Sequence, residues 1–205
     1  MHPIVKTLLP SATIRYSVDG HIRHYHNLDH ALHVLESLNE LVNDVPVHLA
    51  VAALYHDAVY VPGAGSDANE LCSRAALEID WKAIDAGPSI VMVTSQLLIR
   101  NTCIAVHLMN RRAVGDLAVL LDADLHSLAA PWEVFVKNQH NIIRENGGEL
   151  TNENFVKCGE FLRRFLSGRD HIYHTDAGRD KWEAAACENI FKWCNQYNIP
   201  LSPNV

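Results

Sequence analysis

Residues 47–60 read VHLAVAALYHDAVY, and this stretch decides the fold. From Val47 to Leu54 nearly every side chain is apolar, so a helix here would have hardly any polar face and would be buried nearly all round. The run then places His56 and Asp57 in this apolar setting. An ionised carboxylate removed from water is costly unless it is compensated, so Asp57 requires a cation, hydrogen-bond donors or a proton. An arginine or a helix N-terminus would meet this need as well as a metal ion.

Helical periodicity extends outward from this stretch in both directions. Apolar residues recur three and four apart between short Gly- and Pro-containing breakers, and no alternating stretch indicates a sheet. We predict helices at 28–43, 47–60, 67–80, 89–108, 113–129, 132–146, 152–168 and 178–196. With no long linker or repeat, the pattern predicts an all-α bundle of about seven or eight helices in a single domain over residues 1–205.

Composition narrows the classes of function. The 205 residues are 48% hydrophobic and 20% charged, which is typical of a globular protein with a sizeable core. A net charge of −7 argues against long nucleic acids and anionic membranes as partners, and with no long apolar run we expect a cytoplasmic protein. The five cysteines show no C-x-x-C spacing and predict neither a disulfide framework nor a thiolate zinc site, whereas 13 histidines direct attention to metal chemistry.

The predicted helix 113–129 carries a second carboxylate in an apolar stripe. Leu121 follows Leu117 by four residues and Asp124 follows Leu121 by three, whereas Asp122 is rotated away from Asp124 by about 160°. In helix 28–43, His30 lies at the edge of the apolar arc. Two carboxylates and two histidines facing a core can compensate one another by sharing a metal ion. Nitrogen and oxygen donors of this kind suit Mn, Fe, Co, Mg or Zn.

The ordered set His30, His56-Asp57 and Asp124 resembles the H…HD…D signature of the HD superfamily. The strings RHYHNLDH at 23–30, HDAVY at 56–60 and LDADL at 121–125 are similar to its bacterial branch of predicted metal-dependent phosphohydrolases, and the likeness spans roughly residues 16–190. The resemblance implies an all-α HD domain, metal ligation at these four residues, and hydrolysis of a small phosphate ester or anhydride. It does not imply a particular substrate.

Two further residues are catalytic candidates by this resemblance. Several HD enzymes use an acidic residue soon after the H-D pair to activate water, and here the nearest glutamate is Glu70. Glu70 has an equally good structural explanation, because Asp67 and Glu70 have the spacing of a helix capping box. His107 occupies a position where some HD proteins carry an extra histidine for a second metal ion. Its alternative is a histidine at a helix C-terminus, where the helix dipole favours it.

The expected substrate is a small phosphorylated compound, with a nucleotide preferred. Arg23, His26 and Arg144 are candidates to hold a phosphoryl group, since guanidinium matches phosphate oxygens in a bidentate manner. Tyr25 and Asn69 complete the predicted substrate-binding set. For the arginines a solvated helix face is the alternative, and for the tyrosine a core position. A homodimer is also compatible with the sequence.

Two other classes of function compete with hydrolysis. A few HD proteins hold two irons and oxygenate small molecules, which would require about two ligands beyond the four named, with His26 or His107 supplying them. A non-catalytic module would instead have a closed coordination sphere that fastens helices or senses a ligand.

Overall fold

The computed structural model describes residues 1–17, 22–65, 67–87, 89–109, 111–167 and 170–200. Within these ranges the regular structure is entirely helical, which confirms the all-α prediction. The chain divides into two compact units, Met1–His107 and Leu108–Val205. The expectation of one domain over the whole chain stays a prediction, and each unit is described by itself.

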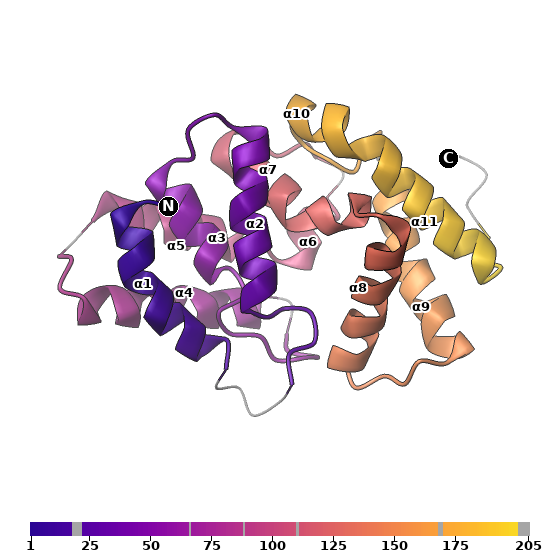
Figure 1. Ribbon diagram of the computed structural model, residues 1–205, viewed down its shortest axis with the longest axis horizontal. Helices are drawn as coiled ribbons and strands as arrows, with labels where there is room; N and C mark the ends of the chain where they lie inside the picture. The colour runs from indigo at the N-terminus through magenta and orange to yellow at the C-terminus, as the bar shows by residue number, and fades with distance from the viewer. Residues whose placement is uncertain (18–21, 66, 88, 110, 168–169, 201–205) are drawn as a thin grey trace. The chain divides into compact units, whose positions relative to one another are not determined.

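The first unit contains six helices within its described residues (Figure 1). They are α1 (Pro3–Arg15), α2 (Leu28–Leu41), α3 (Val47–Tyr55), α4 (Ala68–Ala83), α5 (Ile90–Arg100) and α6 (Ile104–His107). Helix α3 is the centre of this unit: every residue from Leu49 to Tyr55 is buried, and α3 packs against α1, α2, α4 and α5. This is the all-round burial that its apolar sequence predicts.

Helix α1 was not predicted from the sequence. It begins at Pro3, whose fixed φ suits the first turn of a helix, and it tolerates Pro10 in its interior. Its C-terminal end is fastened by Arg15, whose Nη2 donates to Asp80 Oδ1 of α4 at 2.7 Å. The hydroxyl of Tyr55 donates to the other oxygen of the same carboxylate at 3.0 Å. This network ties α1, α3 and α4 together in the interior.

The predicted helix 47–60 is wrong at its C-terminal end, because α3 stops at Tyr55. The carbonyl groups of Asp57 and Ala58 accept hydrogen bonds from the side chain of Arg23 instead of from later residues of a helix. The predicted helix 89–108 is interrupted between Arg100 and Ile104. There the Thr102 hydroxyl donates to the carbonyl of Ile99 at 2.9 Å and helps close the end of α5.

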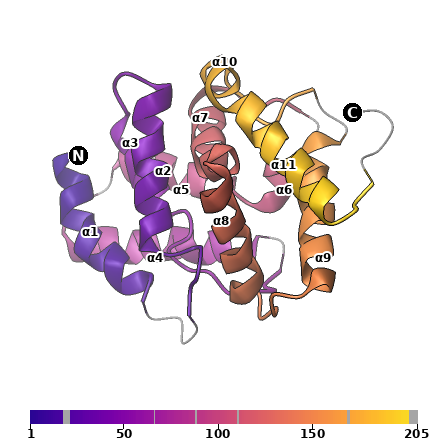
Figure 2. The same ribbon diagram turned by 45° about the vertical axis from the view of Figure 1, so that its right-hand side comes forward.

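The second unit is built from shorter helices around a C-terminal helical run (Figure 2). They are α7 (Gly115–Asp124), the 3-10 helix η1 (Leu125–Ala129), α8 (Trp132–Glu145), α9 (Asn152–Leu162), the 3-10 helix η2 (Arg163–Leu166), α10 (Asp176–Gly178), the π-helical turn η3 (Arg179–Glu183) and α11 (Ala184–Gln196). The predicted helices 113–129 and 152–168 are therefore each an α-helix followed by a 3-10 turn, with residue 168 outside the described residues.

Helix α11 organises the core of the second unit. The Trp193 ring is fully buried, contacts Phe135 and Phe155, and donates from Nε1 to the carbonyl of Phe155 at 3.0 Å. One turn earlier, Asn189 Nδ2 donates to the carbonyls of Leu128 and Ala130, both at 2.8 Å. Helices α8, α9 and η1 are thus fixed to one face of α11. In neither unit do the described residues include a helix long and apolar enough to span a membrane.

Candidate metal centre

His30 enters the site from the first turn of α2. Asn27 is the N-cap of this helix, and its side-chain oxygen accepts from the backbone N–H of His30 at 3.1 Å. This is the capping that an asparagine before an apolar periodic run favours. His30 is only 6% exposed, so its imidazole faces the interior of the unit and not solvent.

His56 and Asp57 lie immediately after α3, in a turn and not within a helix. The Nδ1 atom of His56 lies 2.8 Å from the carbonyl oxygen of Ala53. A carbonyl can only accept, so Nδ1 carries the proton, and in the neutral ring Nε2 is left with the lone pair. A backbone carbonyl that fixes the tautomer in this way is the usual support of a metal-binding histidine.

Three donor atoms converge at this point of the first unit. His56 Nε2 lies 3.3 Å from His30 Nε2 and 3.0 Å from Asp57 Oδ2, and the distance from His30 Nε2 to the same oxygen is 3.7 Å. Two imidazole nitrogens this close to each other and to a carboxylate oxygen require a proton or a cation among them. Because His56 is 1% exposed, water cannot supply the compensation freely. The residues therefore fit a divalent metal ion.

Asp124 is the last residue of α7 in the second unit, and it is half-buried. The sequence stripe placed Asp124 in the core and turned Asp122 away from it, but burial ranks the two the other way, because Asp122 is 0% exposed. The Asp122 carboxylate accepts from the backbone N–H groups of His174 at 2.6 Å and Thr175 at 2.8 Å, and from the Thr175 hydroxyl at 2.7 Å. Asp122 is thus a structural anchor with its own donors, and burial raises the pKa of its carboxyl group.

Glu70 lies in the first turn of α4 and is electrostatically coupled to the centre. Burial, and to a lesser degree the charges of Asp57 and Asp67, raise the pKa of its carboxyl group, while its own backbone N–H and the nearby His107 act in the opposite direction. Asp67 is the N-cap residue of α4 but makes no side-chain capping bond, so the reciprocal capping box is not formed. His107 ends α6 and is 3% exposed.

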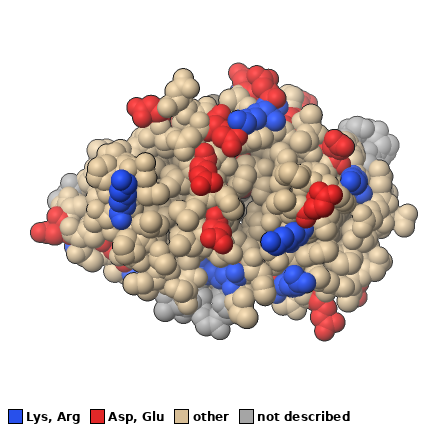
Figure 3. All heavy atoms as spheres, viewed as in Figure 1, with Lys and Arg blue, Asp and Glu red and all other residues tan. Residues whose placement is uncertain are grey.

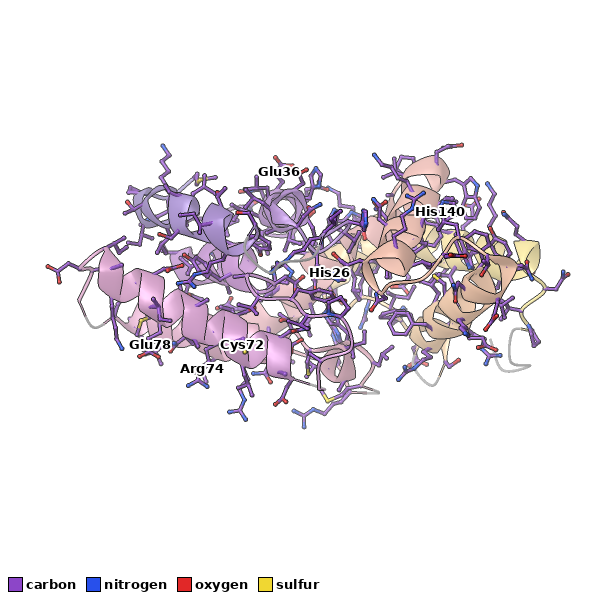
Figure 4. The ribbon with its side chains drawn as sticks, turned by 90° about the horizontal axis from the view of Figure 1, so that it is seen from below. His26, Glu36, Cys72, Arg74, Glu78 and His140 are labelled. Carbon is purple, nitrogen blue, oxygen red and sulfur yellow. The ribbon has the colours of Figure 1, made fainter. Side chains whose placement is uncertain are left out.

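Aromatic rings surround the imidazole of His30. The ring of Tyr25 lies 4.8 Å from it, and His26 is stacked on Tyr60 at 4.0 Å between ring centroids. His26 belongs to the segment before α2 (Figure 4), and its ring lies 5.8 Å from that of His30. The rings of Tyr25 and His26 therefore lie next to the imidazole of His30.

Arg23 and Asn69 direct polar groups toward the main chain. Arg23 Nη1 donates to the carbonyls of Asp57 at 2.7 Å and His26 at 3.2 Å, and Nη2 donates to that of Ala58 at 3.1 Å. Asn69 Oδ1 accepts from the N–H of Val61 at 2.9 Å while its Nδ2 donates to the carbonyl of the same residue at 3.2 Å. Their predicted contacts with substrate stay predictions.

Arg144 is an exposed residue of α8 in the second unit, and its Nη1 lies 3.5 Å from Asn141 Oδ1. Its predicted contact with substrate stays a prediction as well. Sequence reasoning missed Ser73, a fully buried residue of α4 that bonds to the main chain of Val59. Its spacing of four from Asn69 puts both on one face of α4 and could have indicated a shared role.

No family model matches the chain, and neither does any curated protein or solved structure.

Proposed function

We propose that the chain is a metal-dependent phosphohydrolase that acts on a small phosphate ester, and that His30, His56 and Asp57 bind the metal ion. The observation that carries this proposal is the convergence of His30 Nε2, His56 Nε2 and Asp57 Oδ2 within 3.7 Å of one another, with the His56 tautomer fixed by a backbone carbonyl. Structural support of that kind is typical of a metal ligand.

Asp124 of the second unit is proposed as the fourth ligand. This assignment comes from the sequence, in which Asp124 follows the His30 and His56-Asp57 elements as the second carboxylate of an apolar stripe. Its neighbour Asp122 is not proposed as a ligand, because its two oxygens already accept three hydrogen bonds. The full set of two imidazoles and two carboxylates suits Mn, Fe, Co, Mg or Zn and contains no thiolate.

Held by His30, His56 and Asp57, a divalent ion would supply Lewis-acid chemistry, lowering the pKa of water and offsetting charge on phosphoryl oxygens. Glu70 is the group of this chain best suited to take a proton from that water at its carboxylate oxygens. Burial and the charge of Asp57 raise its pKa, which makes its carboxylate a better base at neutral pH than an exposed one. His107, which interacts electrostatically with Glu70, is proposed to tune that group or to bind a second metal ion.

The proposed substrate carries one small phosphoryl group and is not a polyanion. The net charge of −7 gives no long-range attraction for nucleic acid, and on the face shown in Figure 3 Lys and Arg are interspersed with Asp and Glu. Tyr25 and His26 would form the wall against which a base or ring packs. Arg144 stays the proposed partner of the phosphoryl group.

The experiment that tests the proposal compares metal content and turnover in Asp57→Ala and a matched control. Asp29→Ala serves as the control because Asp29 is an exposed aspartate adjacent to His30 in the first turn of α2. We expect the parent and Asp29→Ala to bind the ion and to hydrolyse a member of a panel of nucleotides and sugar phosphates. Asp57→Ala should lose the metal and the activity together.

Each other outcome contradicts a stated part of the proposal. Full metal content in Asp57→Ala would place the centre elsewhere. Two irons per chain with oxidation of a small alcohol or phosphonate would support the oxygenase alternative. Stoichiometric metal with no turnover of any panel member would support a binding or structural module.

A further inference from the structure

The segment that follows α3 is held by side chains and not by regular secondary structure. Residues 57–61 leave the C-terminal end of the helix, where carbonyl groups lose their intrahelical partners. Ala58 is buried and Val59 is half-buried, and backbone groups removed from water are costly without partners. Three side chains from two other elements provide the bonds.

Two side chains of helix α4 bond to the main chain of this segment. Ser73 Oγ accepts from the N–H of Val59 at 3.0 Å and donates to its carbonyl at 3.1 Å. Asn69 repeats this pair of bonds with the N–H and carbonyl of Val61. Asn69 and Ser73 are therefore in register with alternate residues of the segment.

The bonds from α4 to Val59 and Val61 fix where the neighbouring residues of the segment lie. Tyr60 lies between the two bound valines, and its ring is stacked on His26 at 4.0 Å. Asp57 precedes them, and its carbonyl accepts from Arg23, which also donates to the carbonyl of His26. The segment carrying Asp57 and the segment leading to His30 are thus joined through one buried guanidinium group.

We infer that Asn69, Ser73 and Arg23 are positioning residues of the proposed metal centre: their bonds to the main chain hold residues 57–61 in the conformation that directs Asp57 and Tyr60 toward His30 and His26. None of the three touches the ion. Arg23 and Asn69 thereby act on the centre through the backbone and not as ligands of the substrate. This inference rests on the proposed function, because it requires an ion at His30, His56 and Asp57.

A fully buried serine elsewhere in the first unit provides a matched control. Ser95 of α5 donates to the carbonyl of His48 at 2.8 Å, and so fastens the opposite end of α3. Ser95→Ala removes a buried hydroxyl that bonds to main chain in the first turn of α3, and Ser73→Ala removes one that bonds to the segment after α3. Only Ser73 lies next to the segment that carries a proposed ligand.

The test measures Co²⁺ affinity and the visible absorption spectrum of bound Co²⁺ in the full chain and its variants. Supporting residues around metal ligands change affinity by about 10- to 100-fold, so Ser73→Ala should weaken Co²⁺ binding about 10-fold and shift the absorption bands. Asn69→Asp keeps the acceptor for Val61 but loses the donor, and should give a smaller change of the same kind. Ser95→Ala should lower the urea midpoint about as much as Ser73→Ala, with parental Co²⁺ affinity and spectrum.

Two results would overturn the inference. Parental affinity and spectrum in both Ser73→Ala and Asn69→Asp would show that the segment needs no such support, and an equal change in Ser95→Ala would reduce the effect to general stability. If Ser73→Ala does not fold, Asn69→Asp, at a half-buried position, decides the question. A parent chain that binds no Co²⁺ would refute the metal centre itself, and the positioning role with it, whereas the first two results leave the centre intact.

Discussion

The two aspartates that end α7 provide the sharpest test of the fold and the proposed centre together. Asp122 is fully buried and anchors the start of the C-terminal helical run, since Thr175, which it binds, is the N-cap of α10 and accepts from the N–H of Gly178 at 2.9 Å. Asp124 is half-buried and is proposed as a metal ligand. We therefore expect Asp122→Ala to lose stability and Asp124→Ala to lose metal.

The magnitude for Asp122→Ala follows from its three accepted bonds. The Thr175 hydroxyl can turn to another acceptor, but the backbone N–H groups of His174 and Thr175 cannot. Two bonds to a charged acceptor contribute about 3 to 6 kcal/mol. Part of this is offset because the variant no longer buries a carboxylate, whose cost is visible in the raised pKa of Asp122. A net loss of about 3 kcal/mol corresponds to a fall in Tm of about 6 to 12 °C.

The assay is urea unfolding of the metal-free proteins, together with metal content of the folded proteins at low temperature. Asp122→Asn, which keeps one acceptor oxygen, should fall between the parent and Asp122→Ala. Asp124→Ala should change the unfolding free energy by less than about 1 kcal/mol, as expected at a site that solvent reaches. A stable Asp122→Ala that lacks metal, or an Asp124→Ala with full metal content, would refute the assignment of the two roles.

Three further predictions concern other parts of the chain. Arg15→Ala should destabilise the protein by about 2 kcal/mol. This is below the roughly 3 to 5 kcal/mol usual for a broken buried ion pair, because the Arg15 side chain is 31% exposed. A loss under about 0.5 kcal/mol in urea unfolding would contradict this prediction. Glu70→Gln should reduce kcat at least about 100-fold while metal content stays parental, and unchanged kcat would leave Glu70 with no part in proton transfer. Burial, and then the charge of Arg144, lower the pKa of His140. As the pH falls, His140 is therefore protonated in the unfolded chain before it is protonated in the folded chain. The stability that the neutral His140 contributes is fully present above about pH 6.5 and is lost as the pH falls toward the lower pKa of the folded chain. Replacement with Phe should remove that part of the pH dependence, so parallel stability curves from pH 5 to 8 would refute it.

The sequence alone predicted the features that depend on near neighbours along the chain. The apolar run before His56 predicts a buried central helix, and α3 is buried from Leu49 to Tyr55. Helical periodicity predicts a helix from residue 28, and α2 begins at Leu28. Hydrophobic periodicity acts over a turn or two of helix, which is why both helices could be deduced without a structure.

Only the tertiary structure decided where α3 ends and which aspartate is buried. Helix α3 stops at Tyr55, where the carbonyl of Leu54 accepts from the Tyr16 hydroxyl, and in the segment that follows the carbonyl of Asp57 accepts from Arg23, 34 residues away in sequence. Asp122 is buried more deeply than Asp124 because its donors come from a segment 52 and 53 residues away. The approach of His30 to His56 likewise joins residues 26 apart. Hydrogen bonds over such separations outweigh local preference and leave no periodic signal in the chain, so they become visible only once the helices are packed.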